Sequence, residues 1–177
     1  MANKLAIVGY GKMGKMVEQL APEYGFSVHA IIDINDDFAK AKGADAVIEF
    51  TMPDAVVGNV EKLSAMKLPT VIGTTGWLEH MDQVRSIVDR NGTGLIWSPN
   101  FSIGVNVFFR LVNEAAKLLA NEPAYGAWAW EIHHDTKKDA PSGTLIKLVD
   151  EMKKAGYTRH IDVSSNRAGR HPGTHDI

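Results

Sequence analysis

The feature that most constrains the fold is a glycine-rich turn near the N-terminus. An apolar run, Lys4 to Val8, leads into residues 9–14, Gly-Tyr-Gly-Lys-Met-Gly, and a helical pattern of apolar residues follows. A second β-rich run, Ser27 to Ile32, ends in Asp33, 19 residues after Gly14. The Gly-x-Gly-x-x-Gly spacing alone is weak evidence, and a plain strand-turn-helix with a surface aspartate is the alternative. A preceding strand, a following helix and a downstream acid are the context of a dinucleotide-binding fingerprint.

Each position of this turn has a physical task. Gly9 permits the tight turn, Gly11 lets a pyrophosphate approach the backbone, and Gly14 lets the helix pack closely on the strand. The unpaired N–H groups at the helix start favour phosphates. Asp33 can accept hydrogen bonds from ribose hydroxyls but would repel a 2′-phosphate, and Ile34-Asn35 offers no arginine to attract one. The sequence therefore predicts that NADH is preferred over NADPH.

Strand and helix patterns alternate through the rest of the first half. Strand candidates span Asp45 to Phe50, Thr70 to Ile72 and Gly94 to Trp97, with helical patterns at Asp54 to Met66 and Leu78 to Asp89. This alternation predicts a Rossmann-type parallel sheet, whose ligand lies beyond the carboxyl ends of the strands. Each polar turn that follows a strand could be an ordinary loop, but four such turns at one edge favour a site.

The second half has a different organisation. A long helix is expected over Ile103 to Leu119, and Ala127 to His133 reads as a half-exposed antiparallel strand whose aromatic face suits packing or a subunit interface. A helical face precedes Gly156, a strand follows at Ile161 to Ser164, and a third strand begins at the end of the chain. We therefore expect an α/β protein: a dinucleotide-binding domain at 1–103, then a smaller α+β substrate-binding and oligomerisation domain at 104–177. The sheet of the second domain is expected to be open and mainly antiparallel or mixed.

Residues 131–144 carry the richest chemistry, in the sequence Glu-Ile-His-His-Asp-Thr-Lys-Lys-Asp-Ala-Pro-Ser-Gly-Thr. His133 and His134 are consecutive at a strand end, so their rings should point to opposite sides and serve a ligand unequally. Histidine titrates near neutrality, so either is a candidate general acid. Lys137 is a compact positive charge suited to a carboxylate.

The Pro-Ser-Gly-Thr turn of this segment predicts a second anion site. Pro141 suits the first turn of a helix, which would leave the N–H groups around Ser142, Gly143 and Thr144 unpaired. The whole segment is therefore interpreted as a receptor for an acidic small molecule with a proton source. The alternative is a structural histidine beside a solvated lysine turn.

Other chemistries fit these residues poorly. A metal site from His133, His134 and Asp135 is disfavoured, because adjacent residues do not converge without a distant third ligand. His171 and His175 are separated by Pro172-Gly173, which precludes a helix. Ser142 lacks a convincing arrangement of base and orienting group for a nucleophile. We expect no metal.

Composition excludes several classes of protein. Among 177 residues there is no cysteine, so thiol chemistry is excluded, and the net charge of −2 argues against a nucleic-acid partner. No apolar run approaches the length of a membrane span, and the start of the chain leaves no room for a signal peptide. We expect a cytoplasmic protein whose ligands are small molecules.

Together these motifs resemble the 4-hydroxy-tetrahydrodipicolinate reductase (dihydrodipicolinate reductase) family of lysine and diaminopimelate biosynthesis, over essentially the whole chain. The glycine fingerprint is shared with many dehydrogenases, whereas the His-His-x-x-Lys-x-Asp-Ala-Pro-Ser-Gly-Thr string is far more specific. The residues that carry the resemblance are Val8 to Gly14, Glu49 to Pro53, Gly73 to Gly76, Pro99 to Asn106, Glu131 to Thr144, Arg167 to Gly169 and Pro172 to His175.

The resemblance implies hydride transfer from a nicotinamide to a cyclic, imine-derived dicarboxylate, with loss of water, giving tetrahydrodipicolinate. It implies that His133 is the general acid and that Lys137 anchors the substrate and assists transfer. The implied substrate-carboxylate contacts are His134, Thr75, Gly143 and Thr144. The implied cofactor contacts are Gly9, Gly11, Lys12, Met13, Gly14, Asp33, Phe50, Thr51, Gly73, Thr75, Asn100 and Phe101. It also implies a homotetramer joined through the second-domain sheet, if that domain is intact.

Two departures from the family qualify these expectations. The segment between Asp33 and Asp45 is short, and family members normally continue beyond residue 177 with further strands and a C-terminal helix. Either the chain is truncated, or it is an unusually small member of the family. If it is truncated, we expect the second domain to be incomplete and binding to survive while assembly and turnover fail. Two alternatives stay open: another NAD-dependent dehydrogenase acting on a small acidic substrate, and an NAD-binding module whose catalysis is impaired by truncation.

Overall fold

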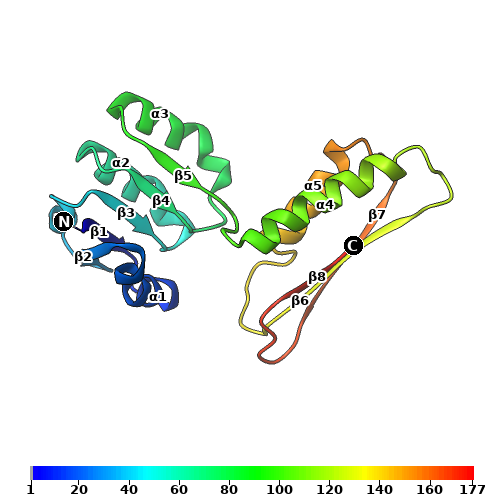
Figure 1. The fold of residues 1–177 in the computed structure, drawn as a ribbon, viewed down its shortest axis with the longest axis horizontal. Coiled ribbons are helices and arrows are strands. Elements are labelled where there is room, and N and C mark those ends of the chain that lie inside the picture. The colour runs from blue at the N-terminus through cyan, green and yellow to red at the C-terminus, as the bar shows by residue number, and fades with distance from the viewer. Residues whose placement is uncertain (1) are drawn as a thin grey trace. The chain divides into compact units, whose positions relative to one another are not determined.

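The computed structural model describes residues 2–177, which divide into two compact units between Pro99 and Asn100 (Figure 1). Each unit combines strands with helices, and the expected α/β class is confirmed, with a parallel sheet in the first unit and a small mixed sheet in the second. Within residues 2–177, no helix has the length and apolar character needed to cross a membrane.

The first unit is built on a parallel five-stranded sheet in the order β2-β1-β3-β4-β5. Its strands are β1 (Asn3–Val8), β2 (Phe26–Ile32), β3 (Ala46–Glu49), β4 (Thr70–Ile72) and β5 (Leu95–Trp97). Its helices are α1 (Lys12–Leu20), α2 (Val56–Ala65) and α3 (Met81–Asn91). The helices α2 and α3 begin later than the sequence pattern predicts, because short 3₁₀ turns at Pro53–Ala55 and Leu78–His80 precede them.

Strand β1 shows why this sheet is buried on both faces. Ala6 and Val8 pack with Leu63 of α2, whereas Leu5 and Ile7 pack on the other side against Val17 of α1. A strand covered on both faces needs a continuous apolar run rather than an alternating one. That requirement explains the uninterrupted apolar sequence of β1. The glycine turn begins at the carboxyl end of this strand, which lies between β2 and β3 in the sheet.

The second unit places two helices on a three-stranded sheet in the order β7-β6-β8. Its elements are α4 (Ile103–Leu119), β6 (Ala127–His133), α5 (Gly143–Lys154), β7 (Ile161–Arg167) and β8 (Thr174–Asp176). Its core is formed by Phe109, Val112 and Ala116 of α4, Leu145, Leu148 and Met152 of α5, Ala129, Tyr157 and Ile161. Ser102 and Ser142 cap the two helices, each accepting a hydrogen bond from a backbone N–H of the first turn.

One expectation about β6 is wrong. This strand is the central one and runs parallel to β7, while only its pairing with β8 is antiparallel. The helix α5 between β6 and β7 makes a crossover connection, and such a connection returns the chain in the same direction. The strand predicted at Ile161 to Ser164 also extends to Arg167, at the edge of the site described below.

Candidate active site

The first unit contains a cavity of about 530 Å³ at the carboxyl ends of β1, β2 and β3. In parallel sheets this edge is where ligands bind, and the strand order places β1 beside the point where the direction of the connections reverses. The lining includes Gly9, Gly11, Asp33, Phe50 and Thr51, all of them expected cofactor contacts. Lys12 and Met13 lie exposed in the first turn of α1, directly after Gly11.

The backbone approaches itself closely at the glycine turn. Gly9 has φ of 89°, and a Cβ built on it would lie 2.0 Å from the carbonyl oxygen of Phe50. A Cβ on Gly14 would lie 2.0 Å from the carbonyl oxygen of Gly9, whereas one on Gly11 would meet no atom within 4 Å. The turn and the helix start therefore require glycine at positions 9 and 14, and the backbone at Gly11 is open to a ligand.

Asp33 lies exposed at the end of β2, where its Oδ1 is 3.4 Å from the backbone nitrogen of Tyr10. Its own N–H donates to Asp36 at 2.9 Å. Lys62 of α2 lines the same cavity, with Nζ 4.5 Å from the centroid of the Phe38 ring. The residues that follow Asp33 in the sequence do not point to this cation, because Lys62 comes from a helix 29 positions further along the chain.

A buried carboxylate organises the loops after β3 and β4. Glu49 accepts hydrogen bonds from Asn59 at 3.1 Å, from Thr74 at 2.7 Å and from the hydroxyl of Thr51. The indole N–H groups of Trp77 and Trp97 both donate to the carbonyl of Thr74. Thr74 is buried, and both its hydroxyl and its carbonyl are engaged within the protein.

The residues expected around the nicotinamide differ in their exposure to solvent. Thr75 is exposed, and the N–H of Gly73 donates to the carbonyl of Glu49 at 2.8 Å. Asn100 and Phe101 belong to the second unit, directly before α4. The Asn100 Oδ1 accepts from the N–H of Ser102 at 2.8 Å, and Phe101 is exposed.

In the second unit, the strand register assembles a polar cluster that the sequence alone does not reveal. Glu131 of β6 pairs with Ser165 of β7 on one side and with His175 of β8 on the other. His133, two residues further along β6, pairs with Arg167. Side chains two residues apart on a strand share a face, so Glu131 and His133 point to the same side of the sheet. This is the side covered by the helices, and both residues are buried.

Glu131 is the centre of the cluster. Its Oε1 accepts from the Ser142 N–H at 2.8 Å, from the Ser165 hydroxyl at 3.0 Å and from Arg167 at 3.2 Å. Its Oε2 accepts from the Ser142 hydroxyl. Burial opposes ionisation of this carboxyl group, but the bonds from Ser142, Ser165 and Arg167 outweigh burial and lower its pKa to about 2. The group is therefore a permanent buried anion at neutral pH.

His133 lies against this anion. Its Nδ1 is 3.5 Å from Oε2 of Glu131 and has no hydrogen-bond partner among residues 2–177. Its ring meets that of His175 edge to face, with centroids 5.0 Å apart. Burial lowers the pKa of His133; the Glu131 charge opposes this change, and His175, Lys137 and Arg167 add to it.

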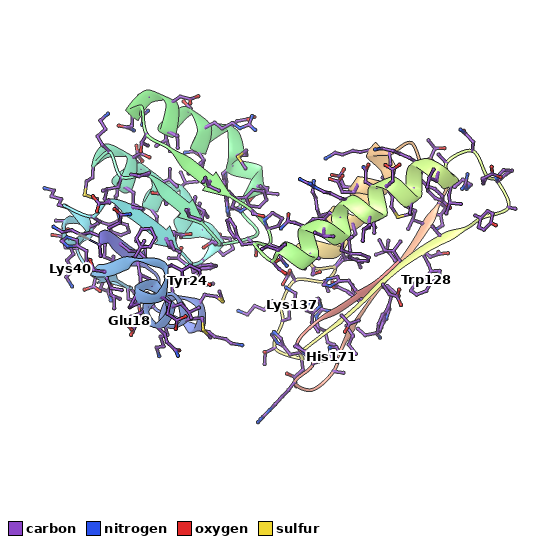
Figure 2. All side chains as sticks on the ribbon, viewed as in Figure 1. Glu18, Tyr24, Lys40, Trp128, Lys137 and His171 are labelled. Atoms are coloured by element: carbon purple, nitrogen blue, oxygen red, sulfur yellow. The ribbon has the colours of Figure 1, made fainter. Side chains whose placement is uncertain are left out.

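His134 and Lys137 occupy different surroundings from His133. The Nδ1 of His134 lies 2.7 Å from the hydroxyl of Thr136, and Lys137 forms a 2.6 Å ion pair with Asp139. Lys137 lies on the loop between β6 and α5 (Figure 2). The two histidines therefore have unequal environments, with the buried one in contact with the anion and the other held at the start of the loop.

The predicted anion site at the start of α5 requires a correction. Pro141 is not in the helix, which begins at Gly143 with Ser142 as its cap. The N–H of Ser142 is already bound to Glu131. Burial works against ionisation of Asp139, but Lys137 and the Gly143 N–H outweigh it and lower the pKa of Asp139. Two carboxylates of the protein itself thus use this helix start, and any ligand anion must share it or displace Asp139. Thr144 is buried in the first turn.

The cluster also has the composition of a metal site. One ligand atom each of Glu131, His133 and His175 lies within 4.8 Å of the others. The sequence suggested two other groupings, His133 with His134 and Asp135, and His171 with His175, and neither is this one. The roles of Ser142, Ser165 and Arg167 as partners of Glu131 were also not predicted. The alternation of Glu131 and His133 along a strand was the available signal, whereas the contribution of His175 depends on the strand register. A separate groove of about 700 Å³ on α4 and α5 includes none of these residues.

A dinucleotide-type cavity on a Rossmann sheet, together with a buried histidine-carboxylate cluster beside a lysine, defines a nicotinamide-dependent oxidoreductase. Family models for the N-terminus and the C-terminus of dihydrodipicolinate reductase match residues 3–101 and 104–177. The chain belongs to the dihydrodipicolinate reductase family.

Individual relatives and a solved structure agree with this assignment. The 4-hydroxy-tetrahydrodipicolinate reductase of Christiangramia forsetii is 31% identical over 98% of this chain and 78% of its own length. That of Staphylococcus carnosus is 32% identical over 98% and 80%. The structure of dipicolinate-bound dihydrodipicolinate reductase from Paenisporosarcina sp. TG-14 superposes with a TM-score of 0.74, at 22% identity, over 99% of this chain and 82% of that one. This last likeness supports the fold.

Proposed function

We propose that this chain catalyses the NAD(P)H-dependent reduction of 4-hydroxy-tetrahydrodipicolinate to tetrahydrodipicolinate, in lysine and diaminopimelate biosynthesis. Family membership over both units supports this reaction. The observation that carries it is the buried pair of His133 and Glu131, with Lys137 on the adjoining loop. They provide a proton source and a cation at one end of the sheet. Reduction of a dicarboxylate requires both, the proton for the reaction and the cation to bind a carboxylate.

The reaction balances with one proton from the protein. The substrate loses its 4-hydroxyl group as water, and the nicotinamide, when bound, supplies a hydride to the resulting conjugated imine. The carbanion-like centre that develops then takes a proton, for which we propose His133. General acids of this kind contribute roughly 10²- to 10⁴-fold to a rate. His133 must be recharged from solvent before the next cycle.

Lys137 is proposed to bind a substrate carboxylate. Its ammonium group is held 2.6 Å from Asp139, so the substrate would replace or share this partner. We propose that His134, Thr75 and the N–H groups of Gly143 and Thr144 make the remaining carboxylate contacts. The N–H groups of a first helical turn have no partner within the helix, which supports their role. The Gly143 N–H serves Asp139, so the substrate carboxylate would share this donor or displace Asp139.

The cavity of the first unit fits a dinucleotide. Its volume of about 530 Å³, the open backbone at Gly11 and the carboxylate of Asp33 suit a pyrophosphate and a ribose. We propose that Gly9, Lys12, Met13 and Gly14 hold the phosphates, and that Gly73, Thr75, Asn100 and Phe101 flank the nicotinamide. Phe50 and Thr51, which line the same cavity as Gly9 and Asp33, are proposed as further cofactor contacts. Asp33 supports a preference for NADH, and Lys62 in the same cavity supports residual use of NADPH.

We also propose that the chain forms a homotetramer through the face of the second sheet that carries Trp128, Trp130 and Ile132. Trp128, which is labelled in Figure 2, lies on the central strand β6. Its exposed fraction of 51% is unusual for a tryptophan there. The cytoplasmic location stays a prediction.

The test is a coupled assay in which a synthase generates the substrate and NADH consumption is followed by absorbance. Cofactor titration beside turnover separates the alternatives. Oxidation of NADH with a different acidic substrate would indicate another dehydrogenase, and binding without oxidation would indicate a non-catalytic module.

A further inference from the structure

All the groups around the Glu131 carboxylate are donors, or become donors when they carry a proton. Oε1 receives the Ser142 N–H, the Ser165 hydroxyl and the Arg167 guanidinium, while Oε2 receives the Ser142 hydroxyl and faces two imidazoles. An ionised carboxylate offers only acceptor sites and so matches such surroundings, whereas an amide would turn its NH₂ group against some of these donors. The position therefore needs a charge and not merely a polar side chain.

The two imidazoles reach the same oxygen from different strands. Nδ1 of His133 is 3.5 Å from Oε2, and Nε2 of His175 is 3.3 Å from it. The Nε2 of His175 is also 3.1 Å from the Ser142 hydroxyl. Both contacts with Oε2 are longer than a good hydrogen bond, and each shortens into one when the nitrogen carries a proton directed at the anion.

The Glu131 carboxylate can serve as the partner of the otherwise unpaired Nδ1 of His133. A buried nitrogen without a partner is costly, and the nearest compensating group is the Glu131 carboxylate. An anion beside Nδ1 favours the tautomer that carries its proton there, and so leaves Nε2 as the nitrogen that exchanges a proton with a ligand. We propose that Glu131 is the positioning residue of this site. Glu131 fixes the orientation and the tautomer of His133, and it holds His175 and the start of α5 in place around the His133 ring. The inference rests on the function proposed above.

A metal ion is the competing explanation of the same three groups. The protein already supplies a cation to Glu131, because Arg167 lies 3.2 Å from Oε1. The Ser142 hydroxyl also occupies Oε2, where an ion would have to bind. These contacts favour the positioning role, and a zinc titration separates the two explanations.

The charged groups that face His133 define the expected pH dependence. Glu131 lies on the same strand, Arg167 on β7, His175 on β8 and Lys137 on the following loop. Glu131 raises the pKa of His133, and the other three lower it. Removing the Glu131 charge therefore lowers this pKa further. A general acid works only while protonated, so the rate falls as pH rises through its pKa, and that fall must move to lower pH in the variant.

The experiment compares the whole chain with Glu131→Gln and with Glu122→Gln, which makes the same change at an exposed loop position. Nitrogen NMR of His133, assigned with His133→Gln, gives the tautomer and the pKa without any turnover. The wild type is expected to show the Nδ1–H tautomer. In Glu131→Gln we expect the pKa of His133 to be lower and its tautomer equilibrium to shift toward Nε2–H. We also expect kcat to fall by roughly 10²-fold, while KM changes only a few-fold. Glu122→Gln is expected to match the wild type.

Three results would overturn the inference. The first is an Nε2–H tautomer in the wild type, which needs no variant and so holds even if Glu131→Gln fails to fold. The second is a folded Glu131→Gln protein in which the tautomer and the pKa of His133 do not change. The third is stoichiometric zinc binding that replaces the Nδ1 proton. If the wild type shows no reductase activity while the NMR changes appear as expected, the proposed function fails and the positioning role stands.

Discussion

Gly173 lies directly against the imidazole of His133: a Cβ built on Gly173 would be 2.9 Å from both Cδ2 and Nε2 of the ring. Gly173 precedes β8, and the antiparallel register, in which Thr174 pairs with Ile132, places it opposite His133. Its φ of 129° lies outside the range that other residues adopt readily. The ring of His133 is thus held between a carboxylate and a glycine.

Gly173→Ala is expected to displace this ring. The added methyl group cannot fit, and the backbone strain costs roughly 1–3 kcal/mol. We expect a fall in kcat/KM of about 10²-fold, because a displacement of about 1 Å at a reacting group has effects of that size. The matched control is Gly156→Ala, since Gly156 has φ of 94° but no atom within 4 Å of an added Cβ. It should lose stability without this loss of activity. Equal losses of activity in both variants, at matched stability, would show that the contact with His133 is unimportant.

His133→Ala is expected to lower kcat by roughly 10²- to 10⁴-fold. NADH binding should persist, because the dinucleotide cavity is lined by residues of the first unit. His160→Ala is a suitable control, since His160 is exposed and its only ion pair within residues 2–177 is with the exposed Asp162. Stopped-flow rates with saturating substrate are the measurement. Near-normal turnover in His133→Ala would exclude it as the acid.

Asp33 and Lys62 should tune cofactor choice in opposite directions. Asp33→Ala is expected to weaken NADH by about 10- to 100-fold, the range for a lost hydrogen bond to a charged group, and to affect NADPH less. Lys62→Ala is expected to weaken NADPH more than NADH. Fluorescence titration of both cofactors gives the four ratios. A uniform loss for both cofactors in Asp33→Ala would point to a folding role.

Glu131 makes stability depend on pH in a defined direction. Its pKa is lowered from 4.5 to about 2 in the folded chain, so its contribution is fully present above pH 4.5 and is lost as pH falls toward 2. The shift corresponds to roughly 3 kcal/mol. Urea unfolding between pH 6 and pH 3 should show the larger part of this loss in the wild type and a smaller loss in Glu131→Gln. Identical slopes in the two proteins would mean that Glu131 is not held as a buried anion.

Local patterns in the sequence were sufficient for much of this structure. The glycine turn, the apolar β1 and the helix from Ile103 to Leu119 are determined by neighbours in the chain, and all were predicted within a few residues. The parallel pairing of β6 with β7 was missed, because the direction of a strand depends on its crossover and not on its own alternation. The position of Pro141 was misjudged because Ser142 is the better helix cap.

The centre of the site was the harder part to predict. Glu131 and His133 were visible as one face of β6, but the aromatic face of Trp128 was the natural candidate for packing. The structure buries the charged face instead, because Ser142, Ser165 and Arg167 satisfy the carboxylate. None of these partners is recognisable before the strands are paired. The same is true of His175 and Gly173, which reach His133 only through β8.

The most direct test of the proposed reaction is the steady-state rate of this chain with synthase-generated substrate and each cofactor, beside the His133→Ala variant. The account predicts substrate-dependent oxidation of NADH, faster than of NADPH, which requires His133 and yields tetrahydrodipicolinate. Binding of NADH without its oxidation in the presence of substrate would contradict it.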